Sequence, residues 1–550
     1  MENSSQLGKR VEISGYIGTI RYYGPLMHTK EPSNPEVIWL GIEWDNYNRG
    51  KNNGTVDSYH YFDCQYCLKY PNGNLYKAGS LVFNDKKVNY GISLEMALIY
   101  KYAPHSQENL DLLKLWEEEL YVVTNTQNRK KIEFPGMKEI MEKFSNTQIL
   151  KEIGLQKLKI SFIENNLNHI IPNVQYLNLD YNLLYDWSQY FTIVKALPNL
   201  YSLSLNHNRL IKPSKSIIND KKEEELINPK LKILSLIAME LGWEDIMILS
   251  KSFKMLEELW LCQNNCSKIS SLNETNELAN LNSLKLLNLE ENDIKSWNEI
   301  SCFSILENLE KLYLGLNFIE TISYFDGFQK LTAITLHGNR IKQIKQINFL
   351  DKFPILSSTR MNDNPLEMIH GKNSRIFIIA KIKKLTCLNG STIKKQDRKD
   401  AEIYYEQKCF EDYLAFEKQN PNYDLKEFMK ENHPRWNELL SIYGYPVNYT
   451  KTIESKENIV PQTSNFATVT LIPVSENAAY KLPISKRIPL NITIKAFKGM
   501  CSKIFGINVL KQKLIFIENQ ENAGIELNED LRLLSFYNIK NQTTIKIQEC

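Results

Sequence analysis

A leucine pattern that recurs through the middle of the chain constrains its fold more than any other feature. The pattern is Leu-x-x-Leu-x-Leu-x-x-Asn, and successive copies start 22 to 31 residues apart. The copies are Val174–Asn182, Leu200–Asn208, Leu256–Asn264, Leu284–Asn292, Leu309–Asn317 and Leu331–Asn339, with weaker ones at Leu231–Met239 and Leu356–Asn364. Alternate leucines of a short strand point to one face, so each repeat can bury that face only by stacking on its neighbours.

This period and pattern are typical of leucine-rich repeats, and they predict an α/β solenoid over residues 151–375. The asparagines would bond backbone groups of the turns, which makes them scaffold residues. Binding residues would instead be the outward ones on the strands. The candidates are Tyr176, Ser202, Trp260, Lys285, Tyr313 and Thr335.

The chain before the repeats contains two segments with different residue patterns. Residues 7–90 contain short aromatic and β-branched runs separated by glycines, which predicts a small all-β barrel. Residues 91–150 have an amphipathic, leucine-rich and acidic pattern that predicts helices. This segment is either a connector or a cap on the solenoid, and the sequence leaves both open.

Three further segments follow the repeats. Residues 376–451 are polar and aromatic and predict a helical cap, and residues 452–466 have the composition of a linker. Residues 467–550 predict strand, strand, helix, strand, strand, the order of an α+β ubiquitin-like β-grasp. The last residues are Gln548-Glu549-Cys550 rather than a double glycine, so we expect an interaction domain and not a conjugated modifier.

Composition excludes several classes of function. The chain has 67 basic and 64 acidic residues, so its net charge of +3 gives no general preference for nucleic acid or membranes. No apolar run approaches the ~20 residues needed to span a bilayer. The nine cysteines are an odd number, which favours reduced thiols and a cytoplasmic protein. Cys64 and Cys67 form one CxxC without a second pair, so we expect structural thiols and no metal.

The sequence also lacks signs of catalysis. It contains no P-loop, GxSxG or HExxH pattern, so we expect no enzyme and no cofactor. A catalytic histidine would need an orienting partner, and the sequence identifies none for His433. We therefore expect His433, which stands before a proline, to be a turn or capping residue.

The loop Gly50-Lys51-Asn52-Asn53-Gly54 carries the strongest functional signal. Glycine allows backbone amides to approach a ligand closely. Lys51 adds a cation, and the two asparagines add donors and acceptors without a fixed charge. Such a loop suits an acidic, extended peptide, which indicates a protein-recognition module.

The first domain resembles the CAP-Gly family. The matching blocks are Gly8–Val11, Gly18–Gly24, Trp39–Asp45, Gly50–Gly54 and Tyr61–Cys64, with Asn53 where the family usually has aspartate. The resemblance implies a groove for acidic C-terminal tails such as that of α-tubulin. Lys51 and Asn52 would hold the terminal carboxylate and tail backbone, and Lys77 would meet the glutamates.

Trp39 and Phe62 would line that groove for an aromatic side chain; the alternative is that both belong only to the core. The full set of expected peptide-binding residues is Trp39, Gly50, Lys51, Asn52, Asn53, Gly54, Phe62, Tyr76 and Lys77.

The chain as a whole resembles the tubulin-folding cofactor family. Support outside the domains comes from Leu388–Ser391, Ala401–Tyr405 and His433–Trp436. The resemblance implies a cytoplasmic, cytoskeleton-associated chaperone that binds α-tubulin. With β-tubulin and other tubulin-folding cofactors it would assemble and dissociate the αβ-heterodimer, and its ubiquitin-like domain would meet a cofactor or the proteasome. The rival hypothesis is a microtubule-associated CAP-Gly scaffold on polymerised tubulin, although such proteins usually carry a long coiled coil and no sustained heptad run occurs here.

Overall fold

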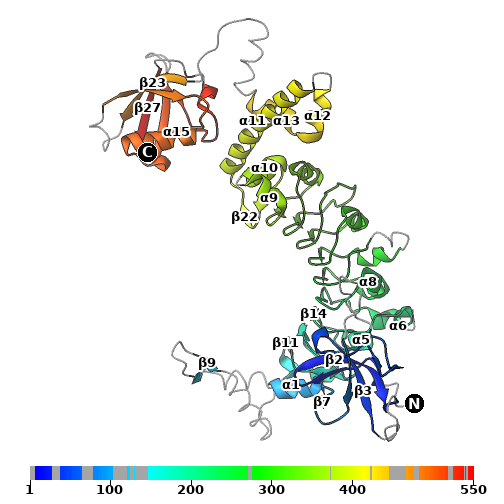
Figure 1. Cartoon of the computed structure of the whole chain (residues 1–550). Helices are drawn as coiled ribbons and strands as arrows, with labels where there is room; N and C mark the ends of the chain where they lie inside the picture. Colours follow the sequence, from blue (N-terminus) through cyan, green and yellow to red (C-terminus); the bar gives the residue numbers. More distant parts are fainter. Residues whose placement is uncertain are drawn as a thin grey trace. The chain divides into compact units, whose positions relative to one another are not determined.

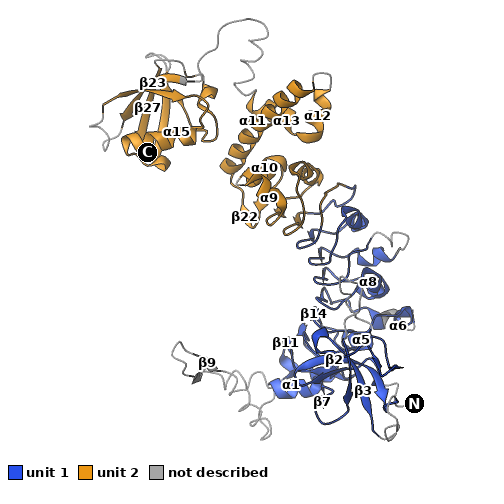
Figure 2. Cartoon of the chain, in the orientation of Figure 1, with its two compact units in different colours: residues 1–318, 325–331 blue, residues 319–324, 332–550 orange. Residues whose placement is uncertain are grey.

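The computed structural model describes most of the chain in two compact units. The described residues are 6–27, 37–64, 78–102, 121–123, 129–131, 147–219, 221–269, 276–371, 373–420, 424–444, 466–474, 482–517, 524–537, 539 and 543–549. The first unit comprises residues 1–318 and 325–331, and the second comprises residues 319–324 and 332–550 (Figure 2). Figure 1 shows the order of the elements along the chain.

The first unit begins with a small antiparallel sheet in the strand order β6-β3-β2-β1-β7. Its strands are β1 (Arg10–Ile13), β2 (Tyr16–Gly24), β3 (Trp39–Trp44), β6 (Gly79–Phe83) and β7 (Val88–Asn89), and η2 (Tyr47–Arg49), β4 (Thr55–Val56) and β5 (Tyr59–His60) lie between β3 and β6. Val11, Ile20, Leu40 and Ile42 are fully buried between these strands. The alternating residues of the sequence thus form the expected all-β domain.

The segment after the barrel joins it to the first repeat. β8 (Ile92–Ser93) pairs in parallel with β12 (Ile160–Phe162), and α1 (Leu94–Tyr102) follows directly. α1 contacts β12 and buries Leu94, Ala97 and Leu98. Because the first coil of a solenoid has no preceding coil to cover it, β8 and α1 serve as its cap.

Part of the helical prediction for residues 91–150 is wrong. β9 (Tyr121–Val123) and β10 (Arg129–Lys131) form an antiparallel pair, and η3 (Thr147–Ile149) precedes the repeats. The aromatic and β-branched side chains of Tyr121-Val122-Val123 favour a strand over a helix. The leucine-rich stretch around Trp116 lies outside the described residues.

The repeats of the first unit stack their strands in parallel and in register, with Leu177 opposite Leu203 and Leu203 opposite Leu234. These strands are β11 (Glu152–Gly154), β13 (Tyr176–Asn178), β14 (Ser202–Ser204), β15 (Ile233–Ser235), β16 (Glu258–Trp260), β17 (Leu286–Asn288) and β18 (Lys311–Tyr313). The connecting helices are α4 (Leu167–Ile170), α5 (Trp187–Ala196), α6 (Lys215–Asn219), α7 (Glu223–Leu226), α8 (Trp243–Leu249), η4 (Ser250–Phe253), η6 (Asn276–Leu281) and η7 (Trp297–Ile305).

The asparagines join successive coils as the sequence predicts. Asn208 is fully buried, and its Nδ2 donates to the carbonyl oxygens of Leu179 and Leu205, both at 2.9 Å. Its Oδ1 accepts from the backbone N–H of Asn182 at 3.1 Å. Each such side chain therefore satisfies buried backbone groups of two coils at once.

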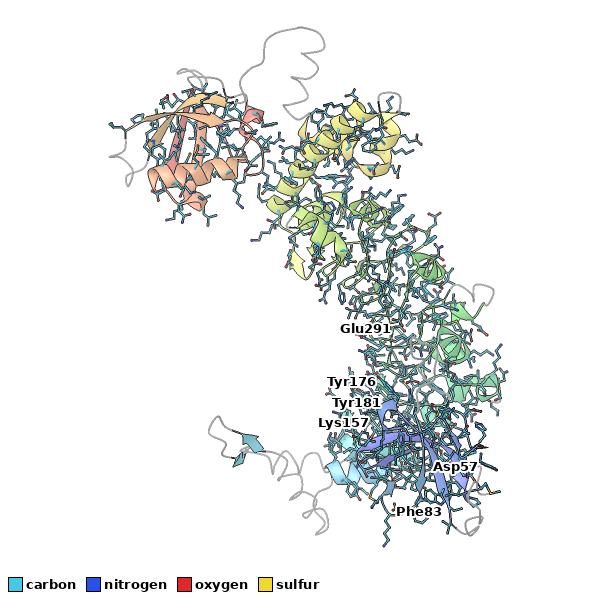
Figure 3. All side chains as sticks on the ribbon, in the orientation of Figure 1. Asp57, Phe83, Lys157, Tyr176, Tyr181 and Glu291 are labelled. Atoms are coloured by element: carbon cyan, nitrogen blue, oxygen red, sulfur yellow. The ribbon has the colours of Figure 1, made fainter. Side chains whose placement is uncertain are left out.

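Several of these asparagines follow a residue with left-handed backbone geometry. φ is 55° at Tyr181, 58° at His207 and 56° at Glu291. The rings of Tyr181 and His207 stack with centroids 4.0 Å apart, and Lys157 Nζ lies 5.1 Å from the Tyr181 centroid. Figure 3 shows Lys157, Tyr181 and Glu291 along one edge of the repeats.

The outward positions follow the prediction with two exceptions. Tyr176, Ser202, Trp260 and Tyr313 lie on strands and are at least partly exposed. Lys285 is exposed but precedes β17, and Thr335 is buried.

The second unit contains the last repeats, a helical cap and a C-terminal sheet. Its repeat elements are β19 (Ala333–Thr335), η8 (Ile344–Lys352), β20 (Ser358–Arg360), α9 (Pro365–His370), α10 (Asn373–Lys381), β21 (Cys387–Leu388) and β22 (Ser391–Thr392). The cap consists of α11 (Lys395–Gln419), α12 (Leu425–Asn432) and α13 (Trp436–Tyr443).

His433 caps α12 and also has partners that the sequence did not reveal. Its backbone N–H donates to Met429 O at 2.8 Å, as expected of a capping residue. Its Nδ1 lies 3.0 Å from Tyr405 Oη and 3.1 Å from Cys409 Sγ, while Nε2 lies 3.1 Å from an oxygen of Asp412. The three partners all come from α11, so the contact fastens α12 to that helix.

The chemistry of this cluster favours a neutral imidazole. Burial lowers the pKa of His433, against the opposing effect of Asp412. Burial also raises the pKa of the Cys409 thiol to about 12, so the thiol stays protonated beside Nδ1. The Cys409 side chain is fully buried, and the cluster holds α11 and the end of α12 together inside the cap.

The C-terminal sheet has the order β24-β23-β27-β25-β26, with β23 and β27 parallel at its centre. Its elements are β23 (Phe466–Val474), β24 (Ile484–Pro489), α15 (Ile494–Phe505), η10 (Val509–Lys511), β25 (Gln512–Ile517), β26 (Ile525–Glu526), η11 (Leu534–Tyr537) and β27 (Thr543–Glu549). Phe497, Leu514 and Ile545 are fully buried or nearly so between helix and sheet, as a β-grasp requires. Among the described helices of the whole chain, none is long and apolar enough to cross a membrane.

We predict that Asn208→Ala lowers the free energy of unfolding by about 3 kcal/mol, because it leaves buried backbone groups of two coils without partners. Urea denaturation followed by circular dichroism measures this change. Asn219→Ala on the exposed side of α6 is the matched control and should change stability by about 0.5 kcal/mol or less. Equal losses in both variants would contradict the scaffold role.

We predict that the helical cap loses stability as the pH falls below about 6.5, the ordinary pKa of histidine. A folded-state pKa below that value means that the unfolded chain binds the proton more readily, so stability rises with pH in this window. Denaturant titrations near pH 7 and near pH 5.5 test the slope. His433→Gln should flatten it, and an unchanged slope would contradict the assignment.

Candidate peptide-binding site

The loop Gly50–Gly54 is held by its own backbone against Gly79, the first residue of β6. The N–H groups of Lys51 and Asn52 both donate to Gly79 O, at 2.7 and 2.9 Å. The Gly79 N–H donates back to Asn52 O at 2.7 Å. This bonding fixes the backbone of the loop and leaves the Lys51 and Asn53 side chains exposed, with Asn52 half-buried.

The two asparagine side chains shape the loop with their oxygens. Asn52 Oδ1 accepts from the Gly54 N–H at 3.0 Å, and Asn53 Oδ1 accepts from the Thr55 N–H at 3.3 Å. An asparagine carries two N–H donors besides its carbonyl oxygen. The loop therefore uses the acceptors internally, and the Nδ2 groups and the Lys51 ammonium are what it can offer to an anionic ligand.

Glycine is required at the end of this loop. Gly54 is buried with φ of +96°, and a Cβ there would stand 1.7 Å from Phe62 O. A Cβ on Gly41 would meet the Phe62 ring at 2.5 Å, and one on Gly79 would meet it at 3.0 Å. The three glycines thus make room for the Phe62 residue.

Phe62 and Trp39 differ in their access to solvent. Phe62 is only 5% exposed, in a cluster with Leu26 and Tyr61, so it forms part of the floor beneath the loop. Trp39 is half-buried and packs edge-to-face on Phe83, with ring centroids 5.6 Å apart. Trp39 thus keeps surface available to a ligand.

Sequence reasoning missed two exposed aromatic residues of the barrel. Phe83 is 45% exposed at the end of β6, and Tyr59 is 40% exposed on β5. Tyr59 packs on Tyr61 at 4.7 Å, and Tyr61 packs on Tyr22 at 5.0 Å. The sequence Gly79–Phe83 has no polar and apolar alternation that could have indicated an outward Phe83. Figure 3 labels it together with Asp57, which lies in the turn between β4 and β5.

Two expected site residues, Tyr76 and Lys77, lie outside the described residues, and their placement stays a prediction. Cys67 lies outside them too, so the CxxC hypothesis is tested at Cys64 alone, where the thiol is half-buried. Within the described ranges, no group of three or more His, Cys, Asp or Glu residues is placed to hold a metal ion.

An ionic contact precedes the loop and ties it to the repeats. Asp45 accepts from Arg10 Nη1 at 2.8 Å within the barrel and from Arg209 Nη1 at 3.0 Å from the repeats. Arg209 also pairs with Glu240. Burial alone would raise the pKa of Asp45, but the two guanidinium groups outweigh it and hold that pKa below its ordinary value.

The segment between Asp45 and the loop is equally constrained. Asn46 caps η2 through its side chain, which accepts from the Asn48 N–H. The Arg49 guanidinium lies 4.5 Å from the Trp44 ring and 4.1 Å from the Tyr16 ring. These contacts position Gly50 and so the start of the binding loop.

Comparison with known proteins gives the same modules. Residues 7–74 match the CAP-Gly domain family and residues 468–550 match the ubiquitin-like domain family. The chain is 30% identical to tubulin-specific chaperone E of Xenopus laevis, over 97% of this chain and 96% of that protein. It is 28% identical to tubulin-folding cofactor E of Arabidopsis thaliana, over 99% of this chain and 98% of that protein.

A solved structure is also similar to the C-terminal part. The solution structure of the C-terminal ubiquitin-like domain of mouse tubulin-specific chaperone e is 23% identical. It covers 16% of this chain and 95% of that one, with a TM-score of 0.14.

We predict that Gly54→Ala destabilises the barrel by about 3 kcal/mol or more, because the new Cβ would overlap a backbone oxygen and φ is positive. Gly15→Ala is the matched control, since Gly15 also has positive φ, +81°, but has no atom within 4 Å of its Cβ position. That variant should lose only about 1 kcal/mol. Thermal unfolding of both variants distinguishes overlap from backbone strain, and equal losses would contradict the close approach of Phe62.

Proposed function

Because the chain belongs to the tubulin-specific chaperone E family, we propose that it is a tubulin-folding chaperone whose N-terminal loop binds the C-terminal tail of α-tubulin. The observation that carries the proposal is the 30% identity to the Xenopus laevis protein over 97% of the chain. The loop Gly50–Gly54 lies inside the matched CAP-Gly segment.

The chemistry of the loop supports an acidic ligand. Lys51 is exposed, and its ammonium would attract the terminal carboxylate of the tail. The Nδ2 groups of Asn52 and Asn53 would donate to the same carboxylate and to the tail backbone, because their Oδ1 atoms are already bonded. Hydrogen bonds between a charged donor and a carboxylate are roughly twice as strong as neutral ones.

The aromatic surface beside the loop supports an aromatic residue at the end of the tail. Trp39, Phe83 and Tyr59 each keep surface exposed. Trp39 packs against the cluster that contains Phe62, and Phe83 packs on Trp39. An aromatic ligand side chain would gain edge-to-face contacts as well as apolar burial there. Tyr76 would extend this surface, and Lys77 would meet the glutamates of the tail.

The other domains would add contacts to the same assembly. We place outward residues of the repeats, such as Tyr176, Trp260 and Tyr313, against the folded body of tubulin. β-Tubulin and other tubulin-folding cofactors would complete the complex in which the αβ-heterodimer is assembled and dissociated. The ubiquitin-like domain would bind a cofactor or the proteasome. Linking a weak tail contact to a second contact raises affinity through effective concentration, by ~10²-fold or more.

This function needs no bond-making step. A chaperone of this kind works by binding and release, so no catalytic residue is assigned. Its location would be cytoplasmic and associated with the cytoskeleton through tubulin.

We predict that Lys51→Ala weakens binding of an acidic peptide ending in a free tyrosine by about tenfold, through loss of a charge-assisted hydrogen bond. Removing the terminal tyrosine should weaken it similarly, and affinity should fall as the salt concentration rises. Isothermal titration calorimetry with the full chain measures all three effects.

The matched control is Lys86→Ala, which removes an exposed lysine of the barrel away from the loop. It should leave the affinity within about twofold of the unchanged chain. Equal affinities of the Lys51 and Lys86 variants would contradict the groove assignment. Exclusive binding to polymerised tubulin in a pelleting assay, with none to soluble α-tubulin, would favour the scaffold hypothesis instead.

A further inference from the structure

A cavity of about 540 Å³ lies in the first unit, where the barrel meets the first repeats. Lys9, Tyr23 and Tyr90 line it from the barrel, and Phe162 and Tyr185 line it from the repeats. Its volume falls within the range of ~300–1,000 Å³ that is usual for ligand pockets, which often occur between domains. None of the described residues that are expected to bind the tubulin tail lines it.

The walls of this junction cavity are joined rigidly. Ile92 of β8 pairs with Ile160 of β12, and the Ile92 N–H donates to Lys159 O at 2.9 Å. Lys159 Nζ lies 2.6 Å from Glu12 Oε2, across the same junction. The cavity is therefore formed before any ligand arrives.

The backbone at one wall of the cavity comes so close to its neighbour that only glycine fits. Gly91 has φ of +82°, and a Cβ there would stand 2.4 Å from Lys159 O and 2.8 Å from Ser161 Cβ. The cavity thus sits directly above a tight contact and not in a loose gap between domains.

The charged residues that line the cavity among the described residues are positive. The lining includes the cations Lys9 and Arg10 and no carboxylate among the described residues that form it. Arg10 is engaged, because its Nη1 donates to Thr19 and Asp45. Lys9 is half-buried and forms no ion pair with any residue in the described ranges. A cation in that position favours an anionic partner.

Asn84 supplies hydrogen-bond donors to the same cavity as Lys9. The Tyr90 hydroxyl donates to Asn84 Oδ1 at 2.8 Å, which leaves the Asn84 amide N–H groups for a ligand. Burial raises the pKa of Tyr90 to about 12, so this hydroxyl stays protonated and keeps Asn84 in place.

The opposite wall, formed by Ser161, Phe162 and Tyr185, carries one fully apolar side chain. Phe162 is 57% exposed, although it belongs to β12 at the centre of the junction. The register of β12 against β8 shifts between Ile160 and Phe162. A ligand that covers Phe162 would gain from the burial of an aromatic ring that now faces water.

We propose that the junction cavity binds an internal acidic segment of a partner polypeptide. A glutamate or aspartate of the segment would bond Lys9 and Asn84, and a neighbouring apolar side chain would cover Phe162. A phosphate-bearing ligand is disfavoured, because phosphate sites gather several backbone N–H groups or arginines around the anion. Among the described lining residues, Lys9 is the cation without an ion pair, and with the Asn84 donors it suits a single carboxylate that lies beside an apolar side chain.

The junction cavity and the loop Gly50–Gly54 are proposed to recognise different groups of a peptide. The loop is proposed to hold a free carboxyl terminus, whereas the cavity needs only a side-chain carboxylate. This distinction allows the two to be tested separately in the full chain.

The test uses the full chain carrying Lys51→Ala, which silences the loop, and a fluorescein-labelled peptide with alternating Glu-Glu-Phe triplets and an amidated C-terminus. Fluorescence polarisation should detect binding. Lys9→Gln and Phe162→Ala should each weaken it by about tenfold, the first through loss of a charge-assisted bond and the second through lost burial. Gln6→Trp, which fills the cavity, should abolish it, since Gln6 lines the cavity.

Lys86→Gln is the matched control and should leave the affinity within about twofold. Unchanged melting temperatures of the variants show that the barrel is intact. Affinity that neither Lys9→Gln nor Phe162→Ala alters would overturn the proposal. Binding of inorganic phosphate that depends on Lys9 and displaces the peptide would also overturn it, since the cavity would then be a small-anion site.

Discussion

The pairing of β8 with β12 is the contact on which the arrangement of the first unit depends. A solenoid exposes the apolar side of its first coil unless another element covers it. Here Ile92 extends the edge beside Ile160, and α1 buries Leu94 and Leu98 against the same coil. The chain therefore uses the segment that follows its barrel as the cap. As a consequence, the loop Gly50–Gly54 and the first repeats belong to one compact unit.

Asp45 connects the junction between barrel and repeats to the segment that leads into the loop Gly50–Gly54. It lies between Arg10 of the barrel and Arg209 of the repeats, and the next residue, Asn46, caps the short helix that leads into Gly50. Two guanidinium groups on one carboxylate offset its desolvation, as the lowered pKa of Asp45 indicates. The same carboxylate thus contributes both to the junction and to the start of the binding loop, so the two are coupled through the backbone rather than through a flexible linker.

The sequence predicted the parts of this structure that are local or periodic. The leucine and asparagine positions indicated the coils because one residue type recurs at each position, and the role of Asn208 follows from its turn. The partners of His433 could not be predicted in this way, because Tyr405 and Cys409 reach it through packing of separate helices. The solvent exposure of the aromatic residues could not be predicted from the sequence either. Phe62 and Trp39 are both aromatic residues of the barrel, yet of the two only Trp39 keeps surface exposed to solvent. The junction cavity arises from two domains and has no pattern in either.

The loop also explains how asparagine can replace the aspartate that CAP-Gly domains usually carry at position 53. The side chain at this position accepts a hydrogen bond from the Thr55 N–H. An amide oxygen can accept this bond as well as a carboxylate oxygen can. Asparagine removes one negative charge beside Lys51 and adds a donor. The loop can therefore keep the same hydrogen bond without a negative charge at this position.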